Sequence, residues 1–270
     1  MESRGFEVRQ AQGVQYLAVS AFEQTGKAKA VFSTRIGGVS EGHFESLNLG
    51  LHRGDDPERV RENFRLFCEA AGLDAGRLVL TAQSHTKNVI AVTADDCGRG
   101  LSREGFSDVD GLVTGEKNVF LTAFFADCVP AFLLDPGKGV CGVVHSGWRG
   151  TAARIAENAV LLMTREYGCR PDDILAAVGP SVCARHYEVS EKVANIITKG
   201  SRCPEAALYT EGHWHADLWE ANRAVLLQSG IAPANITMSG ECTVCRPDRY
   251  YSHRLCGVRR GSLCAVIGLV

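Results

Sequence analysis

The chain has 270 residues, of which 45% are hydrophobic and 22% are charged, and its formal net charge is −2. This is the composition of an ordinary globular protein, and it argues against a basic surface for nucleic acid or acidic membranes. No run of about 18 apolar residues is present, so no membrane-spanning helix is expected, and the polar start MESRGFEVRQAQ does not resemble a secretory leader.

The eleven cysteines are an odd number, scattered without the close spacing of a secreted disulfide scaffold. Most are expected to be reduced thiols in a cytoplasmic protein, and many of them to be buried. No repeat or linker interrupts the chain, and the glycine-rich segment 95–115 is predicted to be a surface loop. A single domain over residues 1–270 is therefore predicted, and a monomer is the expected oligomeric state.

Apolar runs and helical periodicities alternate along the sequence. Strands are predicted at 29–33, 79–83, 89–92, 111–114, 119–125, 131–134, 140–145, 176–178, 236–239 and 265–269, and helices at 57–71, 151–167, 191–199 and 218–229. Asp56 and Pro57 are predicted to start the first helix, and Gly168 to end the second. Many strands with few intervening helices favour an α/β or α+β fold with mixed sheets.

Three segments end an apolar run with a residue of metal-binding type. They are LVLTAQSHTKNV with His85, VFLTAFFADCVPAFLL with Asp127 and Cys128, and GVCGVVHSGWRGT with His145. Catalytic zinc sites use three protein ligands and an open water position, and a Cys–His–His set meets that count. Because the three residues are far apart in the sequence, spacing alone does not establish that they act together.

Each of these residues also has an ordinary structural interpretation. Pro130 cannot donate to a strand ladder, so Asp127 and Cys128 are predicted to lie where a strand stops or bends, a usual place for functional sites. The alternatives are a buried thiol for Cys128, a turn-capping carboxylate for Asp127 and a hydrogen-bonded histidine for His85.

The loop after His145 has the composition of an anion-binding turn. Its glycines let the backbone approach a ligand closely, Arg149 adds a cation, and the following helix offers unpaired N–H groups. The alternative is a glycine-rich turn that Thr151 caps.

At these segments the chain resembles the YfiH/YlmD-type family, also called the laccase-domain, multicopper polyphenol oxidase-like or peptidoglycan editing factor family. The resemblance covers nearly the whole chain from residue 31 onward, with the motifs in the family's order. They are FSTRIGGVSEGHFESLNLG, GDDPERVRENF, QSHTKNV, ADCVPAFLLD, VHSGWRGT, GPSVCARHYEVSEKV, DLWEANRAVL and ECTVC…YYSHR.

The resemblance implies an α/β fold, a mixed β-sheet sandwich with outer helices. It implies metal ligands at His85, Cys128 and His145, which would form the catalytic centre with zinc as cofactor. The implied activities are phosphorolysis of adenosine, inosine and methylthioadenosine to free base and ribose-1-phosphate, and hydrolytic deamination of adenosine. Purine nucleosides and phosphate would then be the small-molecule partners.

Further site residues are expected within this framework. Arg35, Arg149 and the helix start after Gly150 are candidate phosphate binders. Asn48 and Tyr187 are candidate ribose or purine contacts. Asp127 would orient a ligand or act as an acid or base. For Arg35 the alternative is an exposed loop arginine.

The C-terminal part departs from the family pattern at two points. The usual Tyr-Arg-Arg run is replaced by Ser252-His253-Arg254-Leu255, and Arg259 or Arg260 is a candidate for the missing arginine's role. The chain also carries Cys242-Thr-Val-Cys245. No second pair follows at zinc-finger spacing, so this motif is interpreted as two ordinary thiols rather than a structural metal or redox site. On that interpretation, Cys128→Ala loses zinc and Cys245→Ala keeps it.

Other functions stay open. A multicopper oxidase needs repeated His-x-His pairs, whereas this chain has eight histidines and one such pair, His213-Trp-His215, which is predicted to lie in a surface loop. Copper competes with zinc at N/S ligands and is the alternative metal for a polyphenol oxidase. A Cys–His hydrolase would use Cys128 as nucleophile and His145 or His85 as base. Such a hydrolase, or a non-catalytic protein, would fit a role in peptidoglycan precursor editing.

Overall fold

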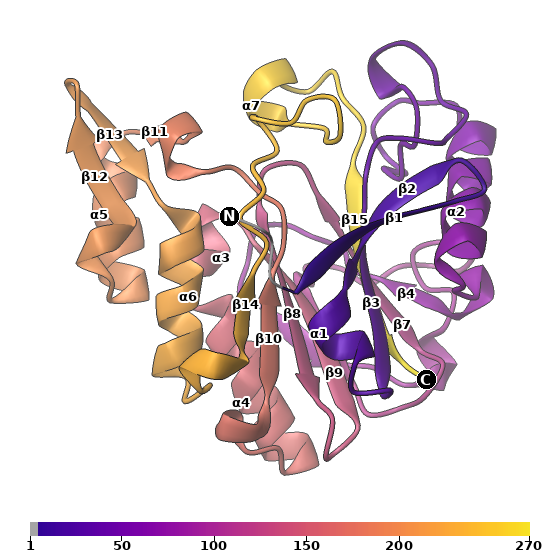
Figure 1. The fold of residues 1–270 in the computed structure, drawn as a ribbon, viewed down its shortest axis with the longest axis horizontal. Coiled ribbons are helices and arrows are strands. Elements are labelled where there is room, and N and C mark those ends of the chain that lie inside the picture. The colour runs from indigo at the N-terminus through magenta and orange to yellow at the C-terminus, as the bar shows by residue number, and fades with distance from the viewer. Residues whose placement is uncertain (1–4) are drawn as a thin grey trace.

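The computed structural model describes residues 5–270, and in these residues two six-stranded sheets and a small three-stranded sheet form (Figure 1). The first sheet has the order β1 (Phe6–Ala11), β2 (Val14–Val19), β3 (Ala28–Ser33), β15 (Leu263–Leu269), β7 (Phe120–Phe125) and β4 (Leu78–Leu80). The second has the order β14 (Ile236–Met238), β10 (Leu175–Val178), β8 (Val129–Asp135), β9 (Val140–Ser146), β6 (Gly111–Thr114) and β5 (Val89–Ala91). The third has the order β11 (Glu188–Val189), β13 (His213–Ala216) and β12 (Ala207–Thr210).

The helices are α1 (Ser20–Glu23), α2 (Pro57–Ala71), α3 (Trp148–Ala152), α4 (Ile155–Tyr167), α5 (Glu191–Ser201), α6 (Leu218–Gln228) and α7 (His253–Cys256). The predicted start of α2 is confirmed, because the Asp56 side chain accepts a hydrogen bond from Glu58 N and Pro57 is the first helical residue. The predicted end of α4 is confirmed by the left-handed backbone of Gly168. Both large sheets mix parallel and antiparallel pairs, as predicted.

The two large sheets pack face to face and each is covered on its outer face by helices. Alternate residues of β15 show this arrangement: Leu263, Ala265 and Ile267 pack between the sheets, whereas Cys264 and Val266 pack toward α2. The outer face of the second sheet packs on α4 and α6. The result is the predicted mixed β-sheet sandwich with outer helices.

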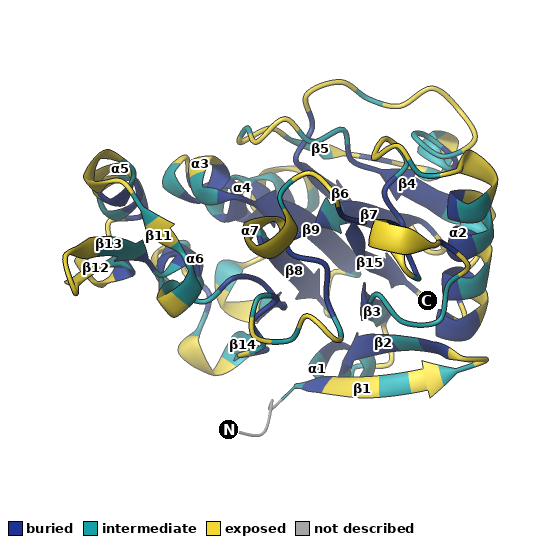
Figure 2. Cartoon of the chain, turned by 90° about the horizontal axis from the view of Figure 1, so that it is seen from above, coloured by how far each residue is buried: buried dark blue, intermediate teal, exposed yellow. Residues whose placement is uncertain are grey.

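Burial on both faces explains why the central strands are continuous apolar runs in the sequence. The central strands are mostly dark in Figure 2, whereas the edge strand β1 and the β12–β13 hairpin are largely exposed. Every residue of β8, β9 and β15 is buried. The sequence located all three of these strands, and the structure extends each of them by one to three residues.

The predicted helix at 151–167 is wrong at its start, because two helices form there. Arg154 has a left-handed backbone with φ of 60° and separates α3 from α4. Its guanidinium donates to Glu157, to the Ser201 carbonyl and to Gln228, and so links α4 to α5 and α6. These tertiary hydrogen bonds stabilise a break that helical periodicity does not reveal.

Two β-hairpins were not predicted. In each of them the two-residue turn consists of a non-glycine residue followed by glycine. Gln12-Gly13 joins β1 to β2 and Glu211-Gly212 joins β12 to β13, with positive φ at each residue, the backbone that tight two-residue hairpins require. The predicted loop at His213-Trp-His215 is therefore wrong, since these residues form β13. Strands β1 and β12 are partly exposed and lack the apolar runs that identified the buried strands, whereas β2 is largely buried.

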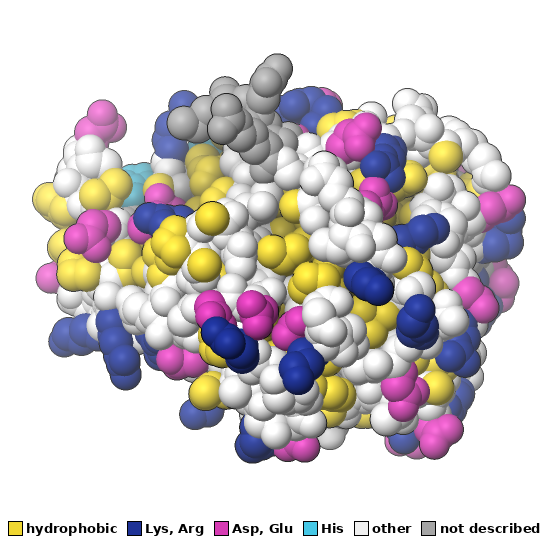
Figure 3. Space-filling view, turned by 60° about the horizontal axis from the view of Figure 1, so that its bottom comes forward, with side chains coloured by type: hydrophobic (Ala, Val, Ile, Leu, Met, Phe, Trp, Pro, Cys, Tyr) yellow, Lys and Arg dark blue, Asp and Glu magenta, His cyan; other side chains and the backbone are white. Residues whose placement is uncertain are grey.

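The surface carries charges of both signs. On the face drawn in Figure 3, Lys and Arg side chains are interspersed with Asp and Glu. Among residues 5–270, no helix is both long and apolar enough to cross a membrane.

Candidate metal centre and active-site cavity

A cavity of about 1280 Å³ opens at the end of the sandwich where β4, β7 and β9 stop. Its wall combines loop 50–53, the segment after β4, loop 100–106, the β7–β8 turn, the start of α3, Tyr187 and the C-terminal segment 253–262. In Figure 2, α7 of that segment lies over the ends of the central strands. Distant parts of the sequence thus meet around one space.

Asp127 and Cys128 lie in the gap between β7 and β8, where the sequence predicts a strand to stop. Asp127 has a left-handed backbone with φ of 85°. Its carboxylate accepts a 2.6 Å hydrogen bond from Thr243 Oγ1 and another of 2.6 Å from Arg254 N. These contacts hold the turn that directs the chain into half-buried Cys128. Pro130 lies within β8, where its carbonyl accepts from Gly179 N.

His145 is a buried residue of β9, and its ring is oriented by a carboxylate. Its Nδ1 lies 2.7 Å from Asp110 Oδ1, and both side chains are buried. Because Nδ1 is engaged, Nε2 is the ring nitrogen left for a metal or a substrate.

Asp110 organises the second histidine as well. Its carboxylate accepts hydrogen bonds from the backbone N–H groups of Ser84, His85 and Thr86 at 3.0–3.1 Å. This loop holds His85 with φ of 64° at the exposed rim of the cavity. Asp110 was not predicted as a site residue, because its only signal in the sequence is its place directly before the predicted strand 111–114.

The ligand atoms of His85, Cys128 and His145 lie within 4.8 Å of one another. In a tetrahedral zinc site with bonds of about 2.0–2.3 Å, ligand atoms are ~3.3–3.8 Å apart, so small side-chain rotations suffice to surround an ion. A β-carbon at Gly147 would come within 3.1 Å of Cys128 Sγ, which explains the glycine at that position. One thiol and two imidazoles form a donor set that fits zinc.

The electrostatics of the cluster favour a thiolate. Burial raises the pKa of Cys128, but the charge of His145 and the hydrogen bonds of both histidines outweigh burial and lower that pKa to about 6. Burial lowers the pKa of His145, while Cys128 and Asp110 together raise it to about 9. Burial opposes the shift at Asp110 too, yet hydrogen bonds lower its pKa to about 2. Cys128 is thus anionic near neutral pH, as a zinc ligand requires.

Two of the other predicted site residues lie at the cavity. Tyr187 lines it and is packed under Arg254, whose Cζ is 5.0 Å from the ring centre. Arg149 lines it as an exposed side chain, with Cζ 4.4 Å from the Trp148 ring centre. The helix start beside it belongs to α3, which has only five residues.

Arg35 and Asn48 do not line the cavity. The Arg35 guanidinium donates to the carbonyls of Glu45 and Pro247, so it ties loops together. Asn48 is fully buried, and its Oδ1 accepts from Gly50 N and Ser262 N, each at 2.9 Å. Asn48 thereby joins two segments of the cavity wall without facing the cavity.

An arginine pair on these two segments was not singled out from the sequence as a pair. Arg53 and Arg260 both line the cavity, and among residues 5–270 neither forms an ion pair with a carboxylate. Arg260 is 7% exposed, and its Nε has no hydrogen-bond partner in the described part of the chain. Burial and the charge of Arg53 lower the pKa of Arg260 to about 10. Two uncompensated cations of this kind suit an anionic ligand.

Asp110→Asn is expected to weaken zinc binding about 10–100-fold, the usual effect of losing a carboxylate that orients a metal-binding histidine. The measurement is zinc affinity by chelator competition on the folded variant. Asp108→Asn is the matched control, because Asp108 lies in the same loop but does not contact His145. Equal zinc affinity in Asp110→Asn and the unaltered protein would contradict the orienting role.

These features define the class of protein: a mixed α/β sandwich with a Cys–His–His cluster at the end of its sheets. The family model described as "Multi-copper polyphenol oxidoreductase laccase" matches residues 29–270, and the chain belongs to this family.

Individual relatives agree with this assignment. The chain is 38% identical over 245 residues to "Purine nucleoside phosphorylase YlmD" of Bacillus subtilis, covering 89% of this chain and 88% of that protein. It is 34% identical over 253 residues to "Adenosine deaminase RL5" of an unknown prokaryotic organism, covering 89% and 94%. The crystal structure of YlmD from Geobacillus stearothermophilus superposes with a TM-score of 0.92 at 35% identity, covering 98% of each chain. The YfiH/YlmD-type resemblance and the fold class are thereby confirmed.

Proposed function

We propose that this protein is a zinc-dependent purine nucleoside phosphorylase that also deaminates adenosine. Its substrates would be adenosine, inosine and methylthioadenosine, and its phosphorolysis products the free base and ribose-1-phosphate. The observation that carries the proposal is one cavity that joins a Cys–His–His cluster to an arginine pair. The names of relatives that are at least 34% identical support an enzyme of this kind.

His85, Cys128 and His145 would hold the zinc ion, with Asp110 fixing the orientation of His145. When bound there, zinc supplies Lewis-acid polarisation and an activated water at neutral pH. Three protein ligands leave a coordination position open, which is the arrangement of a catalytic rather than a structural site. Copper is the alternative metal for the same N/S ligands.

Arg53 and Arg260 would bind phosphate, and Arg149 is a further arginine of the cavity lining. In phosphorolysis a phosphate oxygen forms a bond to the ribose C1′, and the bond from C1′ to the purine nitrogen breaks. The electron pair leaves with the base, which takes up a proton. The two arginines would hold the phosphate dianion in place and offset its charge.

The apolar part of the cavity wall would receive the purine. Phe106, Phe125 and Trp148 supply aromatic surface there, and aromatic faces stack well on planar bases. Tyr187 would donate a hydrogen bond to the nucleoside, because burial and the Cys128 thiolate raise the pKa of Tyr187 to about 12 and keep its hydroxyl protonated. Asp127 would position the turn that carries Cys128, since both of its oxygens already accept hydrogen bonds.

Deamination would occur in the same cavity. Water adds to C6 of adenosine, the bond from C6 to the amino nitrogen breaks, and ammonia leaves with the transferred proton. Tyr187, which lines the cavity and keeps its hydroxyl protonated, would take part in that proton transfer.

The test is a chromatographic product analysis of the zinc-loaded protein with adenosine, in the presence and absence of phosphate. Adenine that forms only with phosphate, and inosine that forms in both samples, are the expected products. Absence of both products would refute the proposed function.

Arg53→Ala is expected to raise the KM for phosphate about 10–100-fold, the cost of losing a hydrogen bond to a charged group, and to leave adenosine deamination unchanged. Initial rates of both reactions measure this. Arg259→Ala is the control, because this exposed arginine lies outside the cavity lining. An equal loss of both activities in Arg53→Ala would assign Arg53 to general folding instead of phosphate binding.

A Cys–His hydrolase is the second candidate, because the pKa of Cys128 is lowered to about 6 beside His145. A reactive thiolate next to an imidazole is the pattern of cysteine nucleophiles. Iodoacetamide distinguishes the two functions. A zinc-bound Cys128 should resist alkylation until a chelator is added, whereas a nucleophile should be alkylated with zinc still in place.

We also propose a reducing, cytoplasmic location. Within residues 5–270 all eleven cysteines are free, and thiols of this number persist in the reduced state mainly inside cells.

A further inference from the structure

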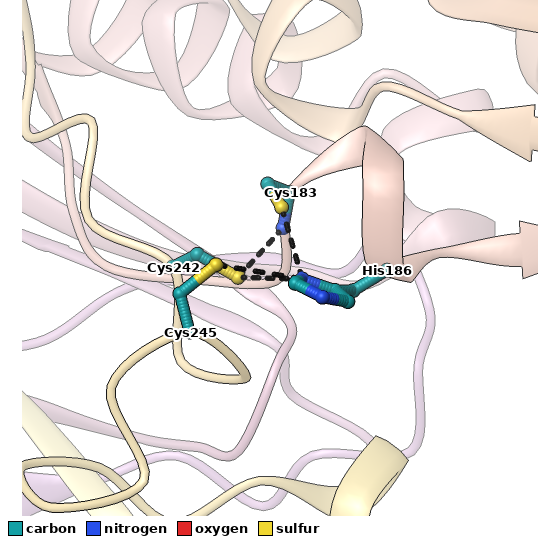
Figure 4. A group of neighbouring side chains, drawn as sticks. All are labelled: Cys183, His186, Cys242 and Cys245. Carbon is teal, nitrogen blue, oxygen red and sulfur yellow. Dashed lines mark hydrogen bonds between the residues drawn. The ribbon is translucent and has the colours of Figure 1, made fainter.

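A second cluster of metal-binding side chains lies outside the cavity (Figure 4). Cys183 and His186 come from the loop between β10 and β11, and Cys242 and Cys245 come from the turn after β14. Figure 4 shows the imidazole of His186 directed toward the three sulfur atoms. The sequence suggested only the Cys242–Cys245 pair, because 56 residues separate His186 from Cys242.

The distances within the cluster are those of ligands around one ion. His186 Nδ1 lies 3.4 Å from Cys183 Sγ, 3.8 Å from Cys242 Sγ and 3.5 Å from Cys245 Sγ. Around a tetrahedral zinc ion, with Zn–S bonds of about 2.3 Å and Zn–N bonds of about 2.0–2.1 Å, nitrogen and sulfur ligands are separated by ~3.6 Å. The nitrogen is therefore already at the spacing that coordination demands of all three sulfurs.

We propose that Cys183, His186, Cys242 and Cys245 bind a second zinc ion in a closed, four-ligand structural site. Three cysteines and one histidine complete a tetrahedron and leave no position for water or substrate, which separates this site from the three-ligand centre in the cavity. Soft thiolate ligands in tetrahedral arrangement select zinc over magnesium or calcium.

The surroundings suit thiolate ligands. Cys183 N donates to Cys242 Sγ at 3.3 Å, and Arg185 Nη2 donates to Cys245 Sγ at 3.4 Å. Such outer hydrogen bonds orient ligands and offset their charge. Cys141 and Cys264 are, by contrast, fully buried strand residues, as expected of thiols that only pack. Under this proposal Cys242 and Cys245 are metal ligands instead of the two ordinary thiols that the sequence suggests.

The second ion would stabilise part of the cavity wall from a position outside the cavity. Ser181 forms two backbone hydrogen bonds across the two segments: its N–H donates to the Glu241 carbonyl, and its carbonyl accepts from Thr243 N. Thr243 lies within the Cys242–Cys245 motif and holds the Asp127 carboxylate, and Tyr187 directly follows His186. A zinc ion that links the segments would fix the positions of Asp127 and Tyr187.

The test is zinc stoichiometry by mass spectrometry of metals on purified, desalted protein. Two zinc ions per chain are expected in the unaltered protein, one in Cys245→Ser, one in His85→Ala and none in the double variant. Cys245 is exposed, so serine is expected to be tolerated, and Cys256→Ser is the matched control with two ions, since exposed Cys256 belongs to neither cluster. The second site would be overturned if folded Cys245→Ser retains two ions. It would also be overturned if Cys245→Ser and the unaltered protein each hold one ion.

A spectroscopic measurement makes the test independent of any variant of the second cluster. In His85→Ala, X-ray absorption at the zinc edge should report three sulfur neighbours at about 2.3 Å and one nitrogen at about 2.0–2.1 Å. A metal-free protein with a Cys242–Cys245 disulfide, detected by alkylation and mass measurement, would contradict the proposal. Neither readout uses nucleoside turnover. The second site is therefore tested independently of the proposed function. Cys245→Ala is accordingly expected to lose one zinc ion instead of keeping its full content.

Discussion

Cys128→Ala is expected to abolish phosphorolysis and deamination together and to remove one zinc ion per chain. Cys128 is the only thiolate of the three-residue cluster, so its loss leaves two imidazoles as ligands. Zinc sites with four protein ligands bind with about 10–16 kcal/mol, and removing one ligand should cost several kcal/mol of that binding. We expect kcat/KM for both reactions to fall at least on the order of 1000-fold, as for other principal catalytic groups.

The variant should stay folded, because Cys128 lies in a turn at the cavity wall and is only half-buried. The measurements are initial rates with adenosine, in the presence and absence of phosphate, and zinc content of the same sample. Cys256→Ala controls for the loss of a thiol elsewhere. Full activity together with a lost zinc ion would show that the metal is not part of the reaction, and retained zinc with lost activity would favour the cysteine nucleophile.

Loss of zinc from the second cluster is expected to have the largest effect on stability. A ligand that binds only the folded state stabilises it by about 4.1 kcal/mol when its free concentration is 1000 times Kd. For a chain of this size each kcal/mol changes Tm by about 2–4 °C, so Cys245→Ser should melt roughly 10 °C below the unaltered protein. The physical reason is that the ion would bind four side chains from two segments, 183–186 and 242–245, in the folded state only.

Thermal melts by circular dichroism, with and without a strong chelator, measure this effect. The chelator should lower the Tm of the unaltered protein and of Cys256→Ser, but have a smaller effect on Cys245→Ser, which already lacks the ion. If Cys245→Ser and Cys256→Ser melt at the same temperature with zinc present, the second cluster does not stabilise the fold.

The mixed α/β sandwich could be predicted from the sequence because its central strands are buried on both faces. Strands such as β8 and β9 must then be continuous apolar runs. Strands β1 and β12 are partly exposed and have no such constraint, and the hairpins that contain them were not predicted. The break between α3 and α4 at Arg154 was not predicted for another reason. Hydrogen bonds from Arg154 to α5 and α6 stabilise its left-handed backbone, and such contacts depend on the tertiary structure.

The sequence by itself determined the class of fold, the family and the segments that carry His85, Cys128 and His145, because strand ends and ligand residues are local features of the chain. Only the tertiary structure decided which residues meet. It placed Asp110 behind His145, joined Arg53 to Arg260, directed Arg35 and Asn48 away from the cavity, and gathered Cys183 and His186 around the Cys242–Cys245 pair. The physical reason is that coordination and ion pairing depend on distances of a few ångströms in space, and residues that are far apart in the sequence reach such distances only through the pairing of strands and the packing of sheets.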